Sequence, residues 1–139
     1  MADEKLTAID ANLLIRVLTN DPPELAERAA EMIDSRRCYV SAVVVMEVFF
    51  VLKSVYRLSK ADLLVSLDRL IDIGLVFDRP AALPAVLNWY DAGMDFGDAM
   101  TLAYAADADE LLTFDRGFAT KAKKLSVRPV VLDGLKLPR

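Results

Sequence analysis

Short apolar runs alternate with helix-forming segments along this 139-residue chain, and the alternation limits the folds that it can adopt. Strands are expected over residues 6–10, 38–40, 74–77, 111–114 and 130–132, and helices over residues 12–18, 24–33, 42–52, 60–72, 81–90, 98–106 and 118–124. Strands that alternate with helices favour a parallel sheet covered by helices on both faces. The predicted fold class is therefore α/β, with the functional crevice beyond the carboxyl ends of the strands.

No low-complexity run, repeat or flexible linker divides the sequence, so residues 1–139 are predicted to form a single domain. A domain of this size can bury a substantial core without disulfides. The chain has no histidine and one cysteine, Cys38, which excludes Ser-His-Asp and Cys-His catalysis, histidine-containing zinc sites and an internal disulfide. Carboxylate, lysine, tyrosine and hydroxyl groups remain as candidate catalytic groups.

The first 30 residues carry charges throughout and contain no continuous apolar stretch of the signal-peptide type. The longest apolar stretch, residues 42–52, is interrupted by Glu47 and is too short to cross a bilayer. We therefore expect a soluble, cytoplasmic protein without a membrane partner.

The formal net charge of -4 is unevenly distributed. Residues 112–139 contain seven basic residues and only two acidic ones, Asp115 and Asp133. A basic segment beside acidic residues fits a polyanion held over a carboxylate site, and it equally fits an ordinary solvated surface.

Glu47 is the only polar residue among the eleven of residues 42–52. An ionised carboxylate in apolar surroundings costs several kcal/mol unless it is paired or bound to a metal ion. The alternative is that Glu47 lies at the rim of its helix and reaches water, or pairs with an arginine. Both interpretations remain open from this segment alone.

Asp10 and Asp115 each follow a predicted strand, and Asp95 and Asp98 lie at the start of a predicted helix that is apolar on nearly all sides. Each could simply cap a helix or occupy its first turn, where the helix dipole favours negative charge. However, with Glu47, four separate elements would bring carboxylates to one edge of the sheet. Clustered carboxylates repel one another unless a counter-charge is present, and hard divalent cations prefer oxygen ligands. The pattern favours a Mg²⁺ or Mn²⁺ site that hydrolyses phosphodiester bonds without histidine.

These residues occur in segments that resemble those of the PIN-domain ribonucleases, and within them the VapC-like toxins of bacterial toxin-antitoxin pairs. The segments are Ile9-Asp10-Ala11-Asn12, Glu47 in its helix, Asp95-Phe96-Gly97-Asp98-Ala99, and Leu112-Thr113-Phe114-Asp115-Arg116-Gly117-Phe118. The resemblance covers nearly the whole chain. It implies a PIN-like three-layer α/β/α sandwich with a mostly parallel central sheet, Mg²⁺- or Mn²⁺-dependent cleavage of RNA, a homodimer, and inhibition by a VapB-like antitoxin.

The resemblance also assigns roles to individual residues. Asp10, Glu47, Asp98 and Asp115 match the catalytic acidic quartet, with Asp10 and Asp98 as the expected direct metal ligands. The matching supporting positions are Asn12 and Thr113, whose hydrogen bonds would orient the acids, and we expect a capping or supporting role for Asp95. The basic residues expected to bind nucleic acid are Arg116, Lys121, Lys123 and Lys124.

Two other classes of function compete with an endoribonuclease toxin. One is a PIN-fold protein-binding module without physiological nuclease activity, with the apolar residues 48–51 and 89–90 as contact surfaces; those residues could equally belong to the core. The other is a different phosphate-handling enzyme, which is disfavoured because the sequence has no Gly-rich phosphate loop, no second acid two residues after Asp10 and no adjacent acid pair after the first strand.

Overall fold

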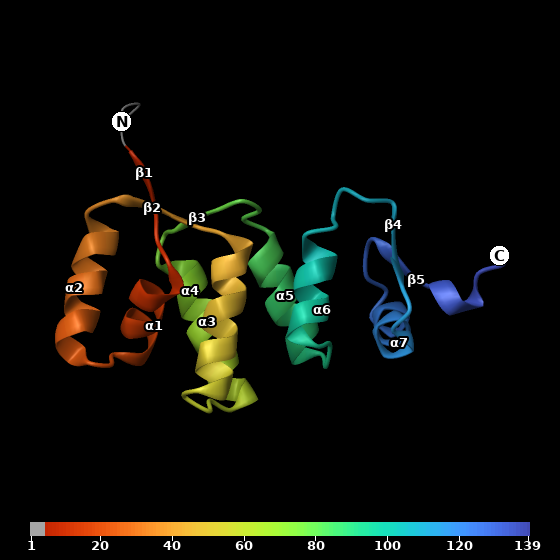
Figure 1. The fold of residues 1–139 in the computed structure, drawn as a ribbon, viewed down its shortest axis with the longest axis horizontal. Helices are drawn as coiled ribbons and strands as arrows, with labels where there is room; N and C mark the ends of the chain where they lie inside the picture. The colour runs from red at the N-terminus through yellow and green to blue at the C-terminus, as the bar shows by residue number, and fades with distance from the viewer. Residues whose placement is uncertain (1–4) are drawn as a thin grey trace. The chain divides into compact units, whose positions relative to one another are not determined.

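The computed structural model describes residues 5–139, and the chain forms two compact units, Met1–Pro80 and Ala81–Arg139 (Figure 1). We call them the N-terminal unit and the C-terminal unit. The expectation of a single domain over residues 1–139 stays a prediction.

The N-terminal unit contains a three-stranded parallel sheet in the order β1-β2-β3. Its strands are β1 (Leu6–Ala8), β2 (Arg37–Val40) and β3 (Val76–Phe77). The register pairs Ala8 with Tyr39, and Val40 with Phe77. Because the strands are parallel, the residues that follow them lie at one edge of the sheet: Asp10 after β1, Ser41 after β2 and Asp78 after β3.

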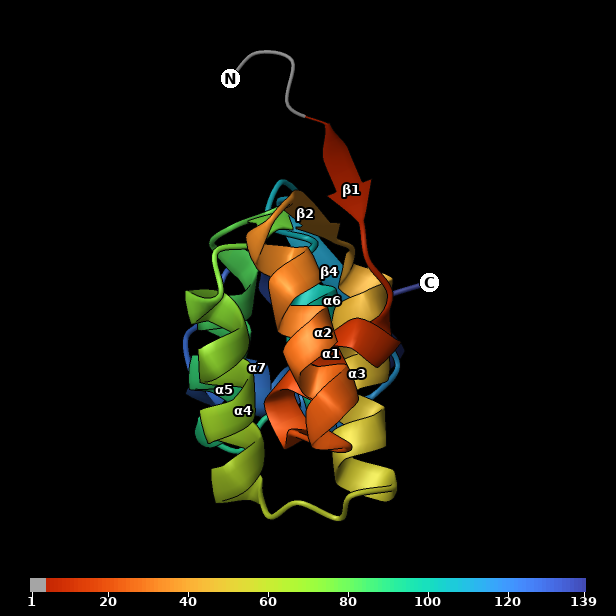
Figure 2. The same ribbon diagram turned by 90° about the vertical axis from the view of Figure 1, so that its left-hand side faces the viewer.

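Four helices complete this unit: α1 (Ala11–Thr19), α2 (Pro23–Asp34), α3 (Ala42–Ser54) and α4 (Lys60–Asp72). Pro23 occupies the first turn of α2, where its missing N–H costs little, and the hydroxyl groups of Ser41 and Ser59 cap α3 and α4. Helix α1 contacts the other three helices, and Figure 2 shows α3 and α4 flanking the α1–α2 pair. Their inward-facing side chains form the core, with Leu14, Val48, Phe49, Leu52 and Leu67 at most 1% exposed.

The C-terminal unit begins with the contacting helices α5 (Ala82–Asp91) and α6 (Phe96–Ala103). A parallel pair of strands follows, β4 (Glu110–Thr113) and β5 (Val130–Asp133), connected by α7 (Arg116–Lys124) and followed by the short 3₁₀ helix η1 (Gly134–Lys136). Helix α7 packs against both strands. The completely buried side chains of this unit come mainly from α5 and α6 and include Val86, Phe96 and Leu102.

The predicted α/β class with parallel strands is therefore confirmed, and each predicted strand and helix is present. The clearest difference concerns the helix expected over residues 98–106, which is α6 and runs from Phe96 to Ala103. It begins earlier because Asp95 is its N-cap, and it ends earlier because Tyr104 is its C-cap and residues 104–109 form turns and bends. At the end of α4, Gly74 has a φ of +89°, a conformation that glycine adopts more easily than other residues.

Within residues 5–139, no helix combines the length and the apolar character needed to span a bilayer.

Candidate active site

Asp10 is exposed, lies two residues after the end of β1 and serves as the N-cap of α1. Its Oδ1 accepts a hydrogen bond from the backbone N–H of Asn12, at 3.0 Å. The capping interpretation of Asp10 is thus correct, and it leaves the second carboxylate oxygen for another ligand. The Asn12 side chain is also exposed, at the second position of α1.

Glu47 lies on the exposed face of α3, together with Val43 and Phe50. The three residues are spaced by four and then three positions, so they follow one face of the helix. Because Glu47 reaches water, it needs no buried partner, and the interpretation of a carboxylate at the helix rim holds. The apolar residues on the opposite face, Val48 and Phe49, are buried in the core.

The first turn of α6 carries two acids. Asp95 Oδ2 accepts a hydrogen bond from the backbone N–H of Asp98, at 3.1 Å, so Asp95 is the N-cap and Asp98 is the third residue of the helix. The rest of α6 is anchored by the buried side chains of Phe96, Ala99 and Met100. This packing holds the Asp98 side chain at the boundary between core and solvent, where it is half-buried.

The electrostatic environment of Asp98 disfavours its charged form. Burial raises the pKa of its carboxyl group above the ordinary value, and the negative charges of Asp95 and Asp115 raise it further. The same factors act on a nearby phenol, because burial and the charge of Asp95 raise the pKa of Tyr90. An excess of negative charge therefore surrounds the start of α6, and a cation bound there would relieve it.

Asp115 follows β4 in the same way that Asp10 follows β1. Its Oδ1 caps α7 by accepting a hydrogen bond from the backbone N–H of Phe118, at 3.0 Å. Its own backbone N–H donates to Thr113 Oγ1, also at 3.0 Å. Thr113 thus fixes the backbone that positions the Asp115 carboxylate. Its role as a supporting residue of an active site stays a prediction.

The predicted acids are divided between the two units. Asp10 and Glu47 belong to the N-terminal unit, whereas Asp95, Asp98 and Asp115 belong to the C-terminal unit, where the charges of Asp95 and Asp115 raise the pKa of Asp98. Within residues 5–139, no three cysteine or acidic side chains form a group arranged to hold a metal ion. By their chemistry, the carboxylate oxygens nonetheless suit Mg²⁺ or Mn²⁺, which prefer hard oxygen donors.

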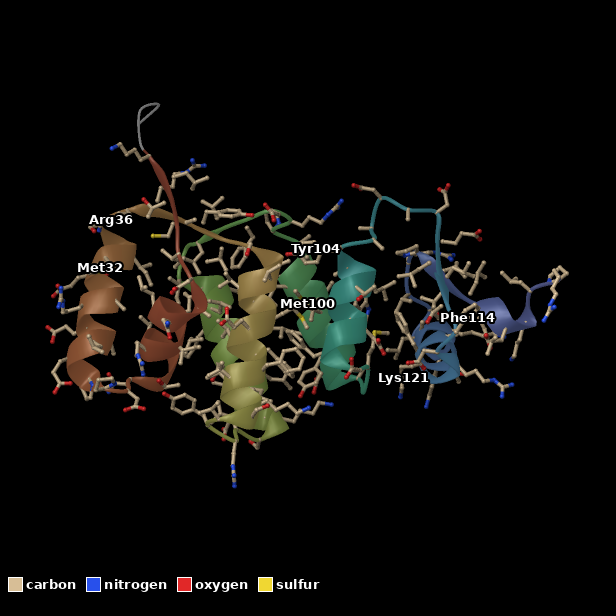
Figure 3. The ribbon with its side chains drawn as sticks, in the orientation of Figure 1. Met32, Arg36, Met100, Tyr104, Phe114 and Lys121 are labelled. Atoms are coloured by element: carbon tan, nitrogen blue, oxygen red, sulfur yellow. The ribbon has the colours of Figure 1, made fainter. Side chains whose placement is uncertain are left out.

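The basic residues expected to bind nucleic acid fall into two groups. Arg116 and Lys123 line a cavity beside α7, whereas Lys121 and Lys124 are not among its lining residues. Lys121, labelled in Figure 3, approaches the turn between α5 and α6, where its Nζ would lie 3.2 Å from a Cβ built on Gly93.

Two further cations line the same cavity, Arg128 and Lys136, which the residue-level prediction did not include. The excess of basic residues over 112–139 was the sequence signal that could have identified them.

The apolar residues considered as protein-contact surfaces are mostly not surfaces. Val48 and Phe49 are buried, and Val51, Trp89 and Tyr90 are half-buried. Phe50 is the exception, with 49% of its area exposed.

Comparison with known proteins places the chain by its sequence. The PIN domain family matches residues 7–124, a span that includes all four acids of the quartet. Neither the search of curated proteins nor the search of solved structures returns a match. The family match extends over most of the chain, and the parallel strands and helices agree with it, so the chain belongs to the PIN-domain family, whose fold is of the nuclease type.

Proposed function

We propose that this protein is a cytoplasmic, metal-dependent endoribonuclease that acts as a toxin and is neutralised by a VapB-like antitoxin. The observation that carries the enzymatic part is the environment of Asp98. A half-buried carboxylate has its pKa raised by burial and by two neighbouring acids, at a position where a PIN-domain nuclease would need a cation.

In this proposal Asp10 and Asp98 bind Mg²⁺ or Mn²⁺ directly, and Glu47 and Asp115 complete the acidic site. Such an ion, when bound, supplies a Lewis acid that lowers the pKa of water and stabilises the leaving oxygen at phosphorus. Carboxylates can also accept a proton from the attacking water, which suits a chain that contains no histidine.

The remaining residues orient these acids. Asp95 holds the first turn of α6 through its hydrogen bond to the Asp98 backbone, and Thr113 holds the backbone of Asp115. Asn12 is the second residue of α1, two positions after Asp10, and is proposed to orient that carboxylate. The basic residues of α7, Arg116, Lys121, Lys123 and Lys124, are proposed to attract the RNA backbone. A homodimer is part of the same proposal.

The direct test is cleavage of RNA by purified protein with Mg²⁺ or Mn²⁺, compared with the variants Asp10→Asn and Asp98→Asn. Asp62→Asn is the matched control, because Asp62 occupies the third position of α4 as Asp98 does in α6, with Ser59 as its cap. We expect cleavage by the wild type and the control, its loss in both site variants, and its loss with a chelator.

Expression in a bacterial host tests the toxin role. Growth arrest with discrete new RNA ends in the wild type, and neither effect in Asp98→Asn, would support it. A folded protein that shows no metal-dependent cleavage and causes no arrest would instead favour the protein-binding module. Light scattering that returns a monomer mass at micromolar concentration would contradict the homodimer.

A further inference from the structure

A cavity of about 500 Å³ lies beside α7 in the C-terminal unit, bounded by that helix, by β5 and by the turn that connects them. Four cationic side chains line it, Arg116, Lys123, Arg128 and Lys136, against a single carboxylate, Asp133. They come from α7, from the connecting turn and from η1, so the fold gathers residues separated by 20 positions in the sequence.

Asp133 only partly offsets these charges. Its Oδ2 lies 3.8 Å from Arg116 Nε, and its side chain is 9% exposed whereas that of Arg116 is 73% exposed. Asp133 also caps η1, because its Oδ1 accepts a hydrogen bond from the backbone N–H of Leu135. The carboxylate therefore has structural partners, and the cationic side chains lining the cavity exceed it by three.

We propose that this cavity binds the phosphate backbone of single-stranded RNA on one side of the cleavage site. The choice of ligand rests on the proposed ribonuclease function. The cavity begins beside Asp115, one of the proposed site residues, because Arg116 on its wall follows Asp115 directly in the chain. In addition, Asp133 on its wall pairs in register with Thr113, the residue that fixes Asp115. An RNA strand held at Asp115 would therefore pass beside these cationic side chains.

The lining residues also predict how the RNA is recognised. Two hydroxyl groups, Thr120 and Ser126, add hydrogen-bonding groups suited to phosphate, and Val127 and Val131 contribute an apolar floor. No aromatic residue lines the cavity, so it offers no platform for base stacking. Binding is therefore expected to depend on salt and to be insensitive to base sequence.

The test measures binding separately from cleavage. Full-length protein with Asp98→Asn, in EDTA, is titrated with a fluorescently labelled single-stranded RNA of about twelve nucleotides, and anisotropy is recorded over a range of KCl concentrations. The test variant adds Lys123→Gln and Lys136→Gln, and the control adds Arg28→Gln and Arg139→Gln, two exposed residues outside the proposed RNA-binding set. The two variants remove the same charge, but only the first removes residues that line the cavity.

We expect the test variant to raise Kd roughly tenfold near 0.1 M salt and to lower the slope of log Kd against log salt by about 1.4, or about 0.7 for each lost phosphate contact. The control should change Kd much less. Two RNAs of different base sequence should give the same result.

Equal effects of the test and control variants would overturn the proposal, since binding would then follow overall charge rather than the cavity. A labelled peptide of Asp and Glu residues that binds through Lys123 and Lys136, while RNA binding is unchanged, would also overturn it and assign the cavity to an acidic protein segment. Cleavage is measured separately on the corresponding protein that keeps Asp98. RNA bound through the cavity but never cut would contradict only the proposed nuclease.

Discussion

The side chain of Asp95 accepts a hydrogen bond from the backbone N–H of Asp98, so that one acid fixes the helical turn that carries another. The same pair repels electrostatically, because the charge of Asp95 contributes to the raised pKa of Asp98. The first turn of α6 thus combines a stabilising cap with a destabilising accumulation of charge. These two contributions can be separated by substitution.

Replacing Asp95 by Ala and by Asn separates the cap from the charge. Both variants remove the same negative charge, but Asn caps helices about as well as Asp and Ala does not. We expect Asp95→Ala to be less stable than Asp95→Asn by about 1 kcal/mol. Urea unfolding followed by circular dichroism measures the difference. Equal stability of the two variants would show that the hydrogen bond at Asp98 contributes nothing.

The raised pKa of Asp98 predicts a pH-dependent stability. Since the folded-state pKa lies above the unfolded one, ionisation of Asp98 costs stability, and the cost grows as pH rises from below the unfolded pKa of about 4 through the folded pKa. In metal-free buffer we expect Asp98→Asn to be more stable than the wild type at pH 7. The gain should vanish near pH 3, where both side chains are neutral.

Thermal unfolding at both pH values provides the measurement, and Asp62→Asn is the control. Asp62 holds the same position in α4, but its cap is the uncharged Ser59. A gain at pH 7 in the control as large as in Asp98→Asn would contradict the electrostatic explanation.

Adding a divalent cation should make the wild type more stable than Asp98→Asn, the reverse of the order expected without metal. An ion that binds the folded protein raises its stability in proportion to the logarithm of ligand concentration over Kd. At a Mg²⁺ or Mn²⁺ concentration of about ten times Kd, the wild type should gain about 1.4 kcal/mol, whereas Asp10→Asn and Asp98→Asn should gain much less. Melting temperatures measured across a metal titration test this. If Asp10→Asn gained as much as the wild type, Asp10 would not be a ligand.

The sequence predicted local structure well because local chemistry determines it. Asp10 and Asp115 follow strands and precede helices, and each caps the helix that follows, as the capping interpretation predicts. Whether the Glu47 side chain is buried or exposed was harder to predict. A single polar residue in an apolar segment does not indicate which face of the helix it occupies, and α3 turns it to solvent while Val48 and Phe49 enter the core.

The arrangement of the basic residues could not be predicted from spacing alone. Lys123 and Lys124 are neighbours with the same charge, but only Lys123 lines the cavity. Lys136 reaches the same cavity because β5 and η1 bring it beside α7. Those contacts depend on tertiary packing rather than on the pattern of charges along the chain.

Thr113 is predicted to act on catalysis through the position of Asp115. Its hydroxyl accepts a hydrogen bond from the backbone N–H of Asp115. Thr113→Val removes this bond and should let the Asp115 carboxylate move more freely, whereas Thr113→Ser keeps the hydroxyl. Loss of such a supporting contact typically costs about 10- to 100-fold in activity. We expect Thr113→Val to lower kcat by about that amount with little change in KM, and Thr113→Ser to remain close to the wild type. A matching loss in both variants would assign the effect to packing.

The thiol of Cys38 should be unreactive in the folded protein. Cys38 is 2% exposed on β2, and burial raises the pKa of its thiol despite the opposing effect of Arg36. Because the thiolate is the reactive form, a thiol reagent such as iodoacetamide should modify almost no protein at pH 7.5 in native buffer and one site in urea. Mass spectrometry distinguishes these states. Rapid modification of the native protein would mean that β2 opens frequently, because the reagent reaches a buried thiol only through local unfolding.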